Sequence, residues 1–201
     1  MTVDFLDCDC QILYGVREVH VRALTAAGVP KTTDWYATDC PVDVGLDPEI
    51  EAGVQSNLKC GDGIKNTIKG DDQLTGMTVT LSLGCRNPEF EFIVGGSVGG
   101  VSYDASSPPC AIGYCPPMLD EQTNAQPFEM RIYRAEYSGS NVVGYEEIWL
   151  YQCLPAFPTI GGKQEDYGTV EWKISAVENP AYTPAEKPVY CWRILTSIPT
   201  S

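Results

Sequence analysis

Hydrophobic and polar residues alternate along several short segments of the chain, which is the pattern of β-strands with one buried face. The alternation is clearest in residues 77–83, MTVTLSL, where an apolar side chain occupies every second position. Comparable runs, rich in β-branched and aromatic residues, lie at 16–24, 128–137, 146–154, 168–177 and 189–195. Turn-forming segments separate them, so we predict a mainly β protein built as an antiparallel sandwich or barrel.

One short helix interrupts this pattern. The Asn-Pro-Glu sequence at 87–89 predicts a helix start, because it offers a capping amide, a proline for the first turn and an acid near the positive end of the dipole. Gly95-Gly96 predicts its end about two turns later. The residues between, 90–94, are too apolar for an exposed loop, so we expect the helix to cover the core. A weaker helix is predicted over 46–54.

Two regions do not fit a compact sandwich. Residues 25–74 and 97–127 are polar and rich in glycine or proline, and we predict long loops for both. Loops of this length are uncommon unless they are functional or lie against a partner. The chain is therefore expected to be a single β-domain, residues 1–201, with two long excursions that contact neighbouring molecules.

Composition excludes several classes of function. The chain of 201 residues has a formal net charge of −14, from 27 acids and 13 bases, and it is unsuited to gripping nucleic acid, because affinity for phosphate comes from Lys and Arg. The start MTVDFLDCDCQ places acids where a secretory signal needs a basic and then an apolar region. No run is apolar for long enough to cross a bilayer, so no membrane insertion is expected. We expect the chain to fold in a reducing cytoplasm.

The nine cysteines admit three interpretations: structural thiols, disulfides formed after release from the cell, or metal ligands. The close pairs, Cys8 with Cys10 and Cys110 with Cys115, do not have the spacing of zinc sites. Those in or beside predicted strands, Cys85, Cys153 and Cys191, are expected to be small buried hydrophobes. Cys110 and Cys115 are the pair for which a disulfide is most expected.

The sequence offers no catalytic constellation. The single histidine, His20, lies in a strand pattern with no serine or cysteine motif beside it, and neither a nucleophile elbow nor a phosphate-binding loop is present. Asp71-Asp72 and Glu146-Glu147 could in principle be paired carboxylates, as in a glycosidase, but adjacent acids are more typical of a solvated surface. We therefore predict no enzyme, and assign no catalytic, cofactor-binding or metal-ligating residue.

The segment LTGMTVTLSLGCRNPEFEFIVGG, residues 74–96, resembles the strand–helix segment of the major tail tube proteins of long-tailed, siphovirus-like bacteriophages. Its alternating strand, its Asn-Pro-Glu helix start and its short apolar helix ending in Gly-Gly carry the resemblance. The preceding polar segment, from residue 46 onward, is similar to that family's connection into the strand. The β-rich remainder is compatible with the family, whereas residues 97–127 have no counterpart in it.

The resemblance implies a structural virion protein. In that family a β-sandwich or barrel with a flanking helix forms hexameric rings, and the rings stack into the tube through which DNA leaves the capsid. The implied partners are other copies of the chain, the tape measure protein, and the tail terminator and distal tail proteins, in a virion tail assembled in the host cytoplasm. DNA would pass through the lumen without specific binding. We expect an acidic inner wall, with Glu171 and Glu146 as candidate lining residues, and no cofactor.

Two alternatives compete with a tail tube subunit. One is a β-sandwich adhesin or decoration module that uses the long loops to contact a receptor. The other is a cysteine-rich secreted hydrolase, which the absence of a signal sequence and of active-site motifs argues against. Self-assembly separates the first two readings, because a tube subunit forms rings whereas an adhesin domain stays monomeric or trimeric.

Overall fold

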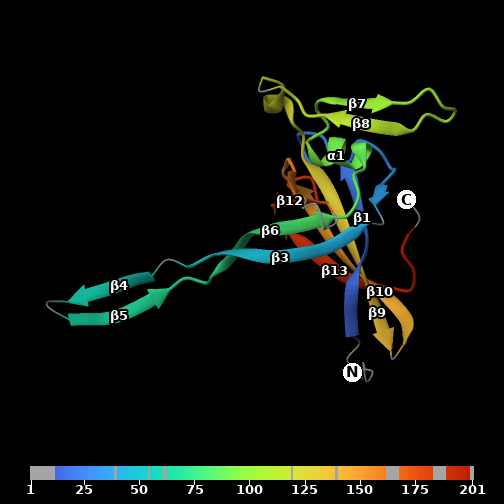
Figure 1. Cartoon of the computed structure of the whole chain (residues 1–201). Helices are drawn as coiled ribbons and strands as arrows, with labels where there is room; N and C mark the ends of the chain where they lie inside the picture. The colour runs from blue at the N-terminus through green and yellow to red at the C-terminus, as the bar shows by residue number, and fades with distance from the viewer. Residues whose placement is uncertain are drawn as a thin grey trace.

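One antiparallel sheet, folded over into two layers, forms the body of the protein (Figure 1). The structure is a computed structural model, and it describes residues 12–38, 40–53, 55–60, 63–118, 120–138, 140–161, 168–182 and 189–199. The fold is mainly β, with one short α-helix and one 3₁₀ turn among the described residues, as the alternating pattern predicts.

Within the described residues the main sheet has nine strands, all antiparallel to their neighbours. Its order is β2 (Tyr36–Thr38), β1 (Ile12–Ala23), β9 (Phe128–Ser138), β10 (Asn141–Cys153), β12 (Thr169–Ala176), β6 (Gln73–Leu83) and β3 (Pro41–Glu51). In addition, β13 (Tyr190–Leu195) pairs with β10, and β11 (Thr159–Gly161) pairs with β12. Each of the six strands predicted from alternation corresponds to one of these, which confirms the prediction.

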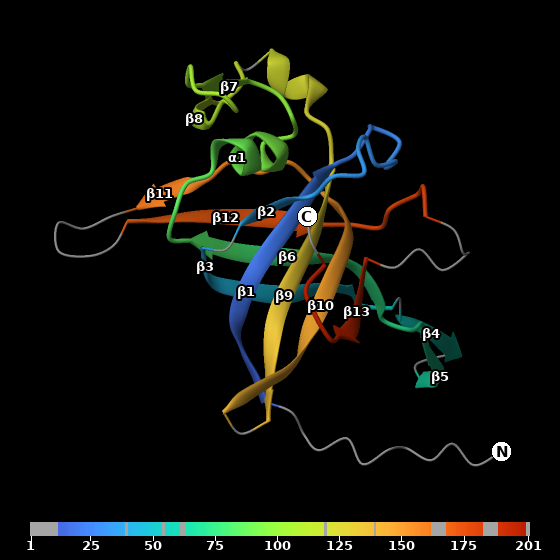
Figure 2. The same cartoon turned by 90° about the vertical axis from the view of Figure 1, so that its right-hand side faces the viewer.

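The sheet folds at the junction between β10 and β12. These two strands share a single aligned pair, Cys153 opposite Ala176, whereas β10 pairs with β9 along most of its length. Beyond this junction β12, β6 and β3 run across β1, β9 and β10, as Figure 2 shows. The apolar faces of the two halves therefore meet, and the core lies between them.

Alternate positions of each strand fill that core. Val79 and Leu81 of β6 face inward, as do Ile132 of β9, Leu150 of β10 and Trp172 of β12, and all are buried. The inward-facing side chains of β12 and β6 lie directly beside each other, because the two strands are aligned residue for residue over seven positions. The period-2 pattern in the sequence thus places the core correctly.

The predicted helix is present as α1 (Pro88–Val94) and is capped as expected. The Asn87 side chain accepts hydrogen bonds from the backbone N–H groups of Glu89 (3.0 Å) and Phe90 (3.2 Å). After the helix the chain turns through Gly96, whose φ of +89° favours glycine. The inward face of α1 is buried over one end of the two-layered core, which is the placement the sequence predicts.

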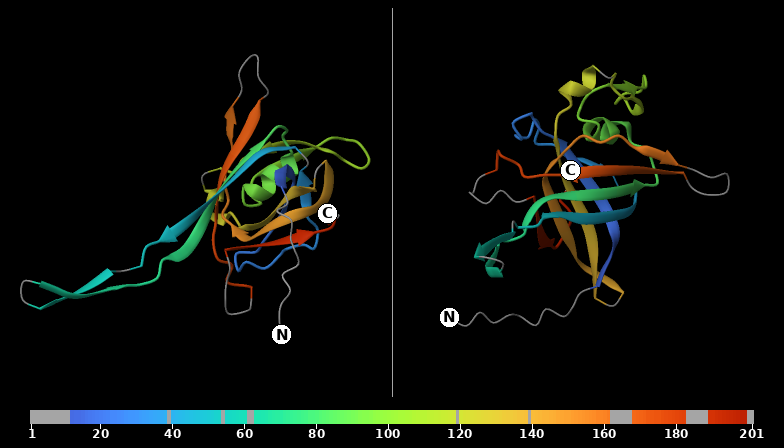
Figure 3. Two further views of the ribbon diagram at one scale, coloured as in Figure 1. Left: turned by 90° about the horizontal axis from the view of Figure 1, so that it is seen from below. Right: turned by 90° about the vertical axis from the view of Figure 1, so that its left-hand side faces the viewer.

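The predicted long loop over 25–74 and the weaker helix over 46–54 are wrong. Residues 41–51 form β3, whose residue Pro48 lies opposite Met77 in the ladder, and the strands continue outward as the hairpin of β4 (Gln55–Cys60) and β5 (Gly63–Lys69). Figures 1 and 3 show this two-stranded arm leaving the body and projecting far from it. Its outer part is remote from the core, so the arm lacks the burial alternation by which strands are predicted.

The second predicted loop, 97–127, is also partly ordered. It contains a hairpin of β7 (Gly100–Tyr103) and β8 (Ala111–Cys115), followed by the 3₁₀ turn η1 (Glu121–Asn124). The hairpin lies over α1, where the ring of Tyr114 packs edge-on against Phe92 at 6.3 Å. The Tyr114 hydroxyl donates to the carbonyl of Val98 (3.1 Å) and fixes the hairpin in place.

Replacing Phe90 by alanine is expected to lower the free energy of unfolding by about 3–5 kcal/mol. The ring is fully buried and packs edge-on against Trp172 at 5.9 Å, so truncation leaves a cavity at the closed end of the core. Denaturant unfolding monitored by circular dichroism measures the change. Phe157→Ala is the matched control, because Phe157 is exposed and its loss should cost less than about 1 kcal/mol. Equal stability of the two variants would contradict the placement of α1.

Candidate functional surfaces

A layer of paired charges and aromatic rings covers the outer face of β1, β9 and β10, the face turned away from the core. At its centre Glu129 is fully buried and accepts four hydrogen bonds. Two come from Arg22, from Nε (2.9 Å) and Nη2 (2.5 Å), one from the indole of Trp149 (2.7 Å) and one from the hydroxyl of Tyr182 (2.8 Å). A buried carboxylate is tolerable only when it is paired and hydrogen-bonded in this way.

Aromatic rings and guanidinium groups stack across the same layer. Arg131 lies between the rings of Trp35 and Trp149, with its central carbon 4.2 and 4.1 Å from their centroids. Arg22 packs on Trp35 at 4.4 Å. Such cation–π contacts are strongest where water is excluded. Through Trp35, the stack attaches the segment before β2 to the sheet.

A second buried carboxylate, Glu147, anchors the other end of the layer. It accepts a hydrogen bond from the hydroxyl of Tyr133 (2.8 Å) and one from Nε of Arg193 on β13. Burial, followed by the hydrogen bond to Glu147, raises the pKa of Tyr133 well above its ordinary value. The carboxylates of this layer are therefore occupied by protein donors and stabilise the sheet.

The acids and the histidine singled out in the sequence do not form a common site. His20 is buried on β1, where Nε2 lies 2.9 Å from a carboxylate oxygen of Glu18. Glu146 and Glu147 are adjacent on β10 and therefore point to opposite faces of the sheet. Glu146 accepts a hydrogen bond from Nε of Arg134 (2.6 Å), whereas Glu147 pairs with Tyr133 and Arg193. Asp72 lies at the base of the arm, where it accepts a hydrogen bond from the backbone N–H of Gly53 (2.9 Å).

The cysteine expectations are partly wrong. Cys110 and Cys115 are free thiols, one directly before β8 and one at its end, and the extended chain between them spans about 16 Å, far beyond the reach of a disulfide. Cys153 is buried in the core as predicted, and burial raises the pKa of its thiol. Cys191 is exposed on β13 and Cys85 is half-buried, so neither is a buried hydrophobe. The pair Cys8 and Cys10 lies outside the described residues.

The outer face of β3, β6 and β12 is acidic. The ladder aligns Asp43, Ser82 and Glu171 in one row across the three strands, and the next rows bring in Asp47 and Lys173. The charged residues of this face are exposed. Glu171 therefore lies on an exposed acidic surface, whereas Glu146 is buried in its ion pair with Arg134 and cannot line such a surface.

Strand β13 presents an open edge of the sheet. It pairs with β10 on one side, and no described strand pairs with the other side. Trp192 and Ile194 lie opposite the inward-facing positions of β10, yet they are 63% and 51% exposed. The edge thus combines unpaired backbone groups with apolar side chains that nothing in the described chain covers.

The described residues contain no group of three or more His, Cys, Asp and Glu side chains arranged to hold a metal ion. No helix in the described part of the chain has the length and apolar character needed to cross a membrane. Comparison of the chain with protein-family models and with curated proteins finds no match.

Stability is expected to fall at high pH, in part through Tyr182. Burial, followed by the hydrogen bond to Glu129, raises the pKa of Tyr182 to about 12 in the folded protein, from an ordinary value of 10.0. The folded state keeps a proton that the unfolded chain loses, so this contribution is complete below pH 10.0 and is lost as the pH rises toward 12. Melting temperatures across this range should fall less steeply for Tyr182→Phe than for the unchanged protein. Identical slopes would contradict the assignment.

Proposed function

We propose that this chain is a structural subunit that assembles with copies of itself into stacked hexameric rings, as the tail tube subunits of long-tailed bacteriophages do. The open edge of β13 is the observation that carries the proposal. A six-residue strand with exposed Trp192 and Ile194, whose backbone is paired with β10 on one side and with no described strand on the other, is a surface for another strand. Pairing with a neighbouring copy would satisfy its hydrogen bonds and bury its apolar side chains.

The other ends of the sheet support this choice, because they are protected against such pairing. Strands β2 and β11 have three residues each, and β3 carries Pro41, Pro48 and several acids, which remove backbone donors and repel a second acidic chain. Strand β13 has neither a proline nor an acid, and its one charged residue, Arg193, is bound to Glu147. Association is therefore directed to the edge of β13, and for a ring to close this edge must meet a different surface of the neighbouring copy.

The rest of the architecture suits a tube. A subunit whose β13 edge meets a different surface of its neighbour, repeated around a rotational axis, builds a closed ring in which no β13 edge stays open. The arm of β3 to β6 and the β7–β8 hairpin project from the body, where they are available for contacts between rings (Figure 3). In this assembly the tape measure protein and DNA would occupy the lumen, and the tail terminator and distal tail proteins would close its ends.

The acidic face of β3, β6 and β12 is the surface we assign to the lumen. A basic wall would hold DNA through phosphate contacts and counterion release. Carboxylates such as Asp43, Asp47 and Glu171 repel the phosphates, over a range of roughly 8–10 Å set by salt, and let the duplex slide.

The purified protein is expected to form rings or tubes that are visible by negative-stain electron microscopy at high concentration. Ile194→Lys should keep the fold but lower assembly, because it places an uncompensated charge on the open edge. Val29→Lys is the matched control, since Val29 is exposed on a turn far from β13 in sequence. A chain that stays monomeric at every concentration would overturn the proposal and favour a β-sandwich binding module.

The lumen assignment predicts a change in DNA retention. Tubes of the unchanged protein should release added linear DNA, whereas tubes built from Glu171→Lys subunits should retain it at low salt and lose it as salt rises. Glu121→Lys is the control with the same change of charge, on η1 outside the acidic face. A structure of the assembled tube with a lumen lined chiefly by Lys and Arg, or by apolar side chains, would show the assignment to be wrong.

A further inference from the structure

The segment between β1 and β2 forms one wall of a cleft of about 540 Å³. Lys31, Thr32 and Tyr36 line this wall, and Phe92 of α1 and Val101 of β7 also line the cleft. Strand β2, at the end of the segment, has three residues and pairs with β1 alone among the described strands. Because so short a strand makes few backbone hydrogen bonds, the wall depends on side-chain contacts for its position.

Two arginines hold Trp35, which lies in this segment directly before β2. The central carbon of Arg22 lies 4.4 Å from the ring centroid of Trp35, and that of Arg131 lies 4.2 Å from it. The guanidinium of Arg22 is fixed in turn, because it donates two hydrogen bonds to the buried carboxylate of Glu129. Arg131 is the second cation on which the position of Trp35 depends.

Arg131 is itself incompletely paired. Its Nη1 lies 3.5 Å from Oε1 of Glu147, beyond the ordinary hydrogen-bond distance of about 2.9 Å. Its Nε is buried and has no hydrogen-bond partner among the described residues, which is unfavourable for a donor. The guanidinium therefore has two competing positions: the observed one, stacked between the rings of Trp35 and Trp149, and one closer to Glu147.

Glu147 is shared between Arg131 and Arg193, and Arg193 lies on the open edge of β13. The carboxylate is 1% exposed and accepts hydrogen bonds from Tyr133 and from Nε of Arg193. The side chain of Arg193 is 53% exposed, so a molecule that binds at the edge can reach it. A buried carboxylate that loses a cation attracts the nearest remaining one, because an unpaired buried charge is costly. That remaining cation is Arg131.

We infer that Arg131 couples the open edge of β13 to the wall of the cleft. While Arg193 pairs with Glu147, Arg131 stays on Trp35 and the wall keeps its position. When a molecule at the edge draws Arg193 away, Arg131 moves toward Glu147, Trp35 loses one of its two cations and the wall loosens. Coupling is reciprocal, so a ligand that holds the wall strengthens the pairing of Arg193 with Glu147. The coupling acts within a single chain and goes beyond the proposed function.

Amide hydrogen exchange of the full-length protein in dilute solution measures the coupling. Arg193→Gln removes the cation at the edge, so residues 31–38 should exchange about threefold to tenfold faster at short labelling times, when local openings dominate. The core strand β12 should be unchanged at those times. Exchange of residues 31–38 that is no faster than in the unchanged protein overturns the inference.

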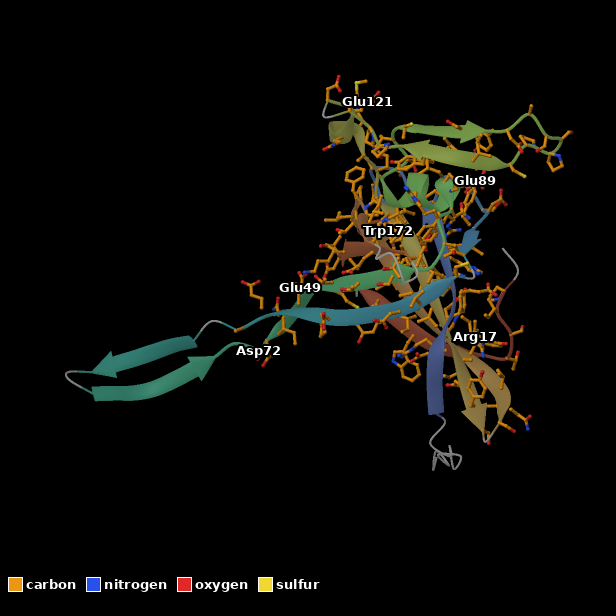
Figure 4. All side chains as sticks on the ribbon, in the orientation of Figure 1. Arg17, Glu49, Asp72, Glu89, Glu121 and Trp172 are labelled. Carbon is orange, nitrogen blue, oxygen red and sulfur yellow. The ribbon has the colours of Figure 1, made fainter. Side chains whose placement is uncertain are left out.

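Arg17→Gln is the matched control for loss of an arginine from the same sheet. Arg17 is exposed and bonds to the hydroxyl of Tyr137. Figure 4 shows it well away from Glu89, which lines the cleft. This variant should leave the exchange of residues 31–38 unchanged, and an acceleration equal to that of Arg193→Gln overturns the inference.

Two altered backgrounds test whether Arg131 transmits the change. In Arg131→Met no cation can move to Glu147, and in Glu147→Gln no buried charge attracts one. Adding Arg193→Gln to either should leave the exchange of residues 31–38 as it is in that background alone. An added acceleration of the same size as in the otherwise unchanged protein overturns the inference, because the effect then bypasses Arg131. A chain that never forms rings contradicts the proposed function and leaves this inference standing.

Discussion

The contact between Phe90 and Trp172 closes the core on which the other features of the molecule depend. A sheet that folds over at one junction leaves its two layers open at the end where they diverge, and Trp172 lies buried at that point. Helix α1 covers it because Asn87 and Pro88 start the helix with Phe90 directed inward. The buried carboxylate of Glu91 accepts two hydrogen bonds from Arg86, at 2.7 and 2.6 Å, which tie the residue before the N-cap to the helix.

The packing of Trp172 against Phe90 leaves one buried polar group without a hydrogen bond. The indole N–H of Trp172 is buried and has no hydrogen-bond partner among the described residues, a loss of about 1–3 kcal/mol. The edge-on contact with Phe90 and the burial of two large rings offset that loss. The β7–β8 hairpin and the segment before β2 both lie against α1, so the position of the helix also sets the shape of the surfaces around it.

The strands and the helix were predictable from sequence because each is specified locally. Alternation in 77–83 and the Asn-Pro-Glu start require no knowledge of distant residues. The charged layer on β9 was not predictable, since Glu129 and Arg131 occupy the polar positions of an alternating strand and suggest a solvated face. They are buried because Trp35 and Tyr182, from remote parts of the chain, cover them. The arm was missed for the opposite reason: its strands pair beyond the core, so cross-strand pairing replaces hydrophobic alternation.

An assembling subunit must stay soluble alone and still bind its copies, and in the proposed assembly the charge distribution meets both demands. Acids on β3 and β12 and prolines on β3 keep most of the sheet from pairing at random. The exception is the edge of β13, whose Arg193 is neutralised by the buried Glu147. Because Glu147 also accepts a hydrogen bond from Tyr133 on β9, Arg193 anchors the open edge to the layer of paired charges on β9 and β10. Pairing at that edge then loses little conformational entropy, which allows a six-residue strand to be an effective interface.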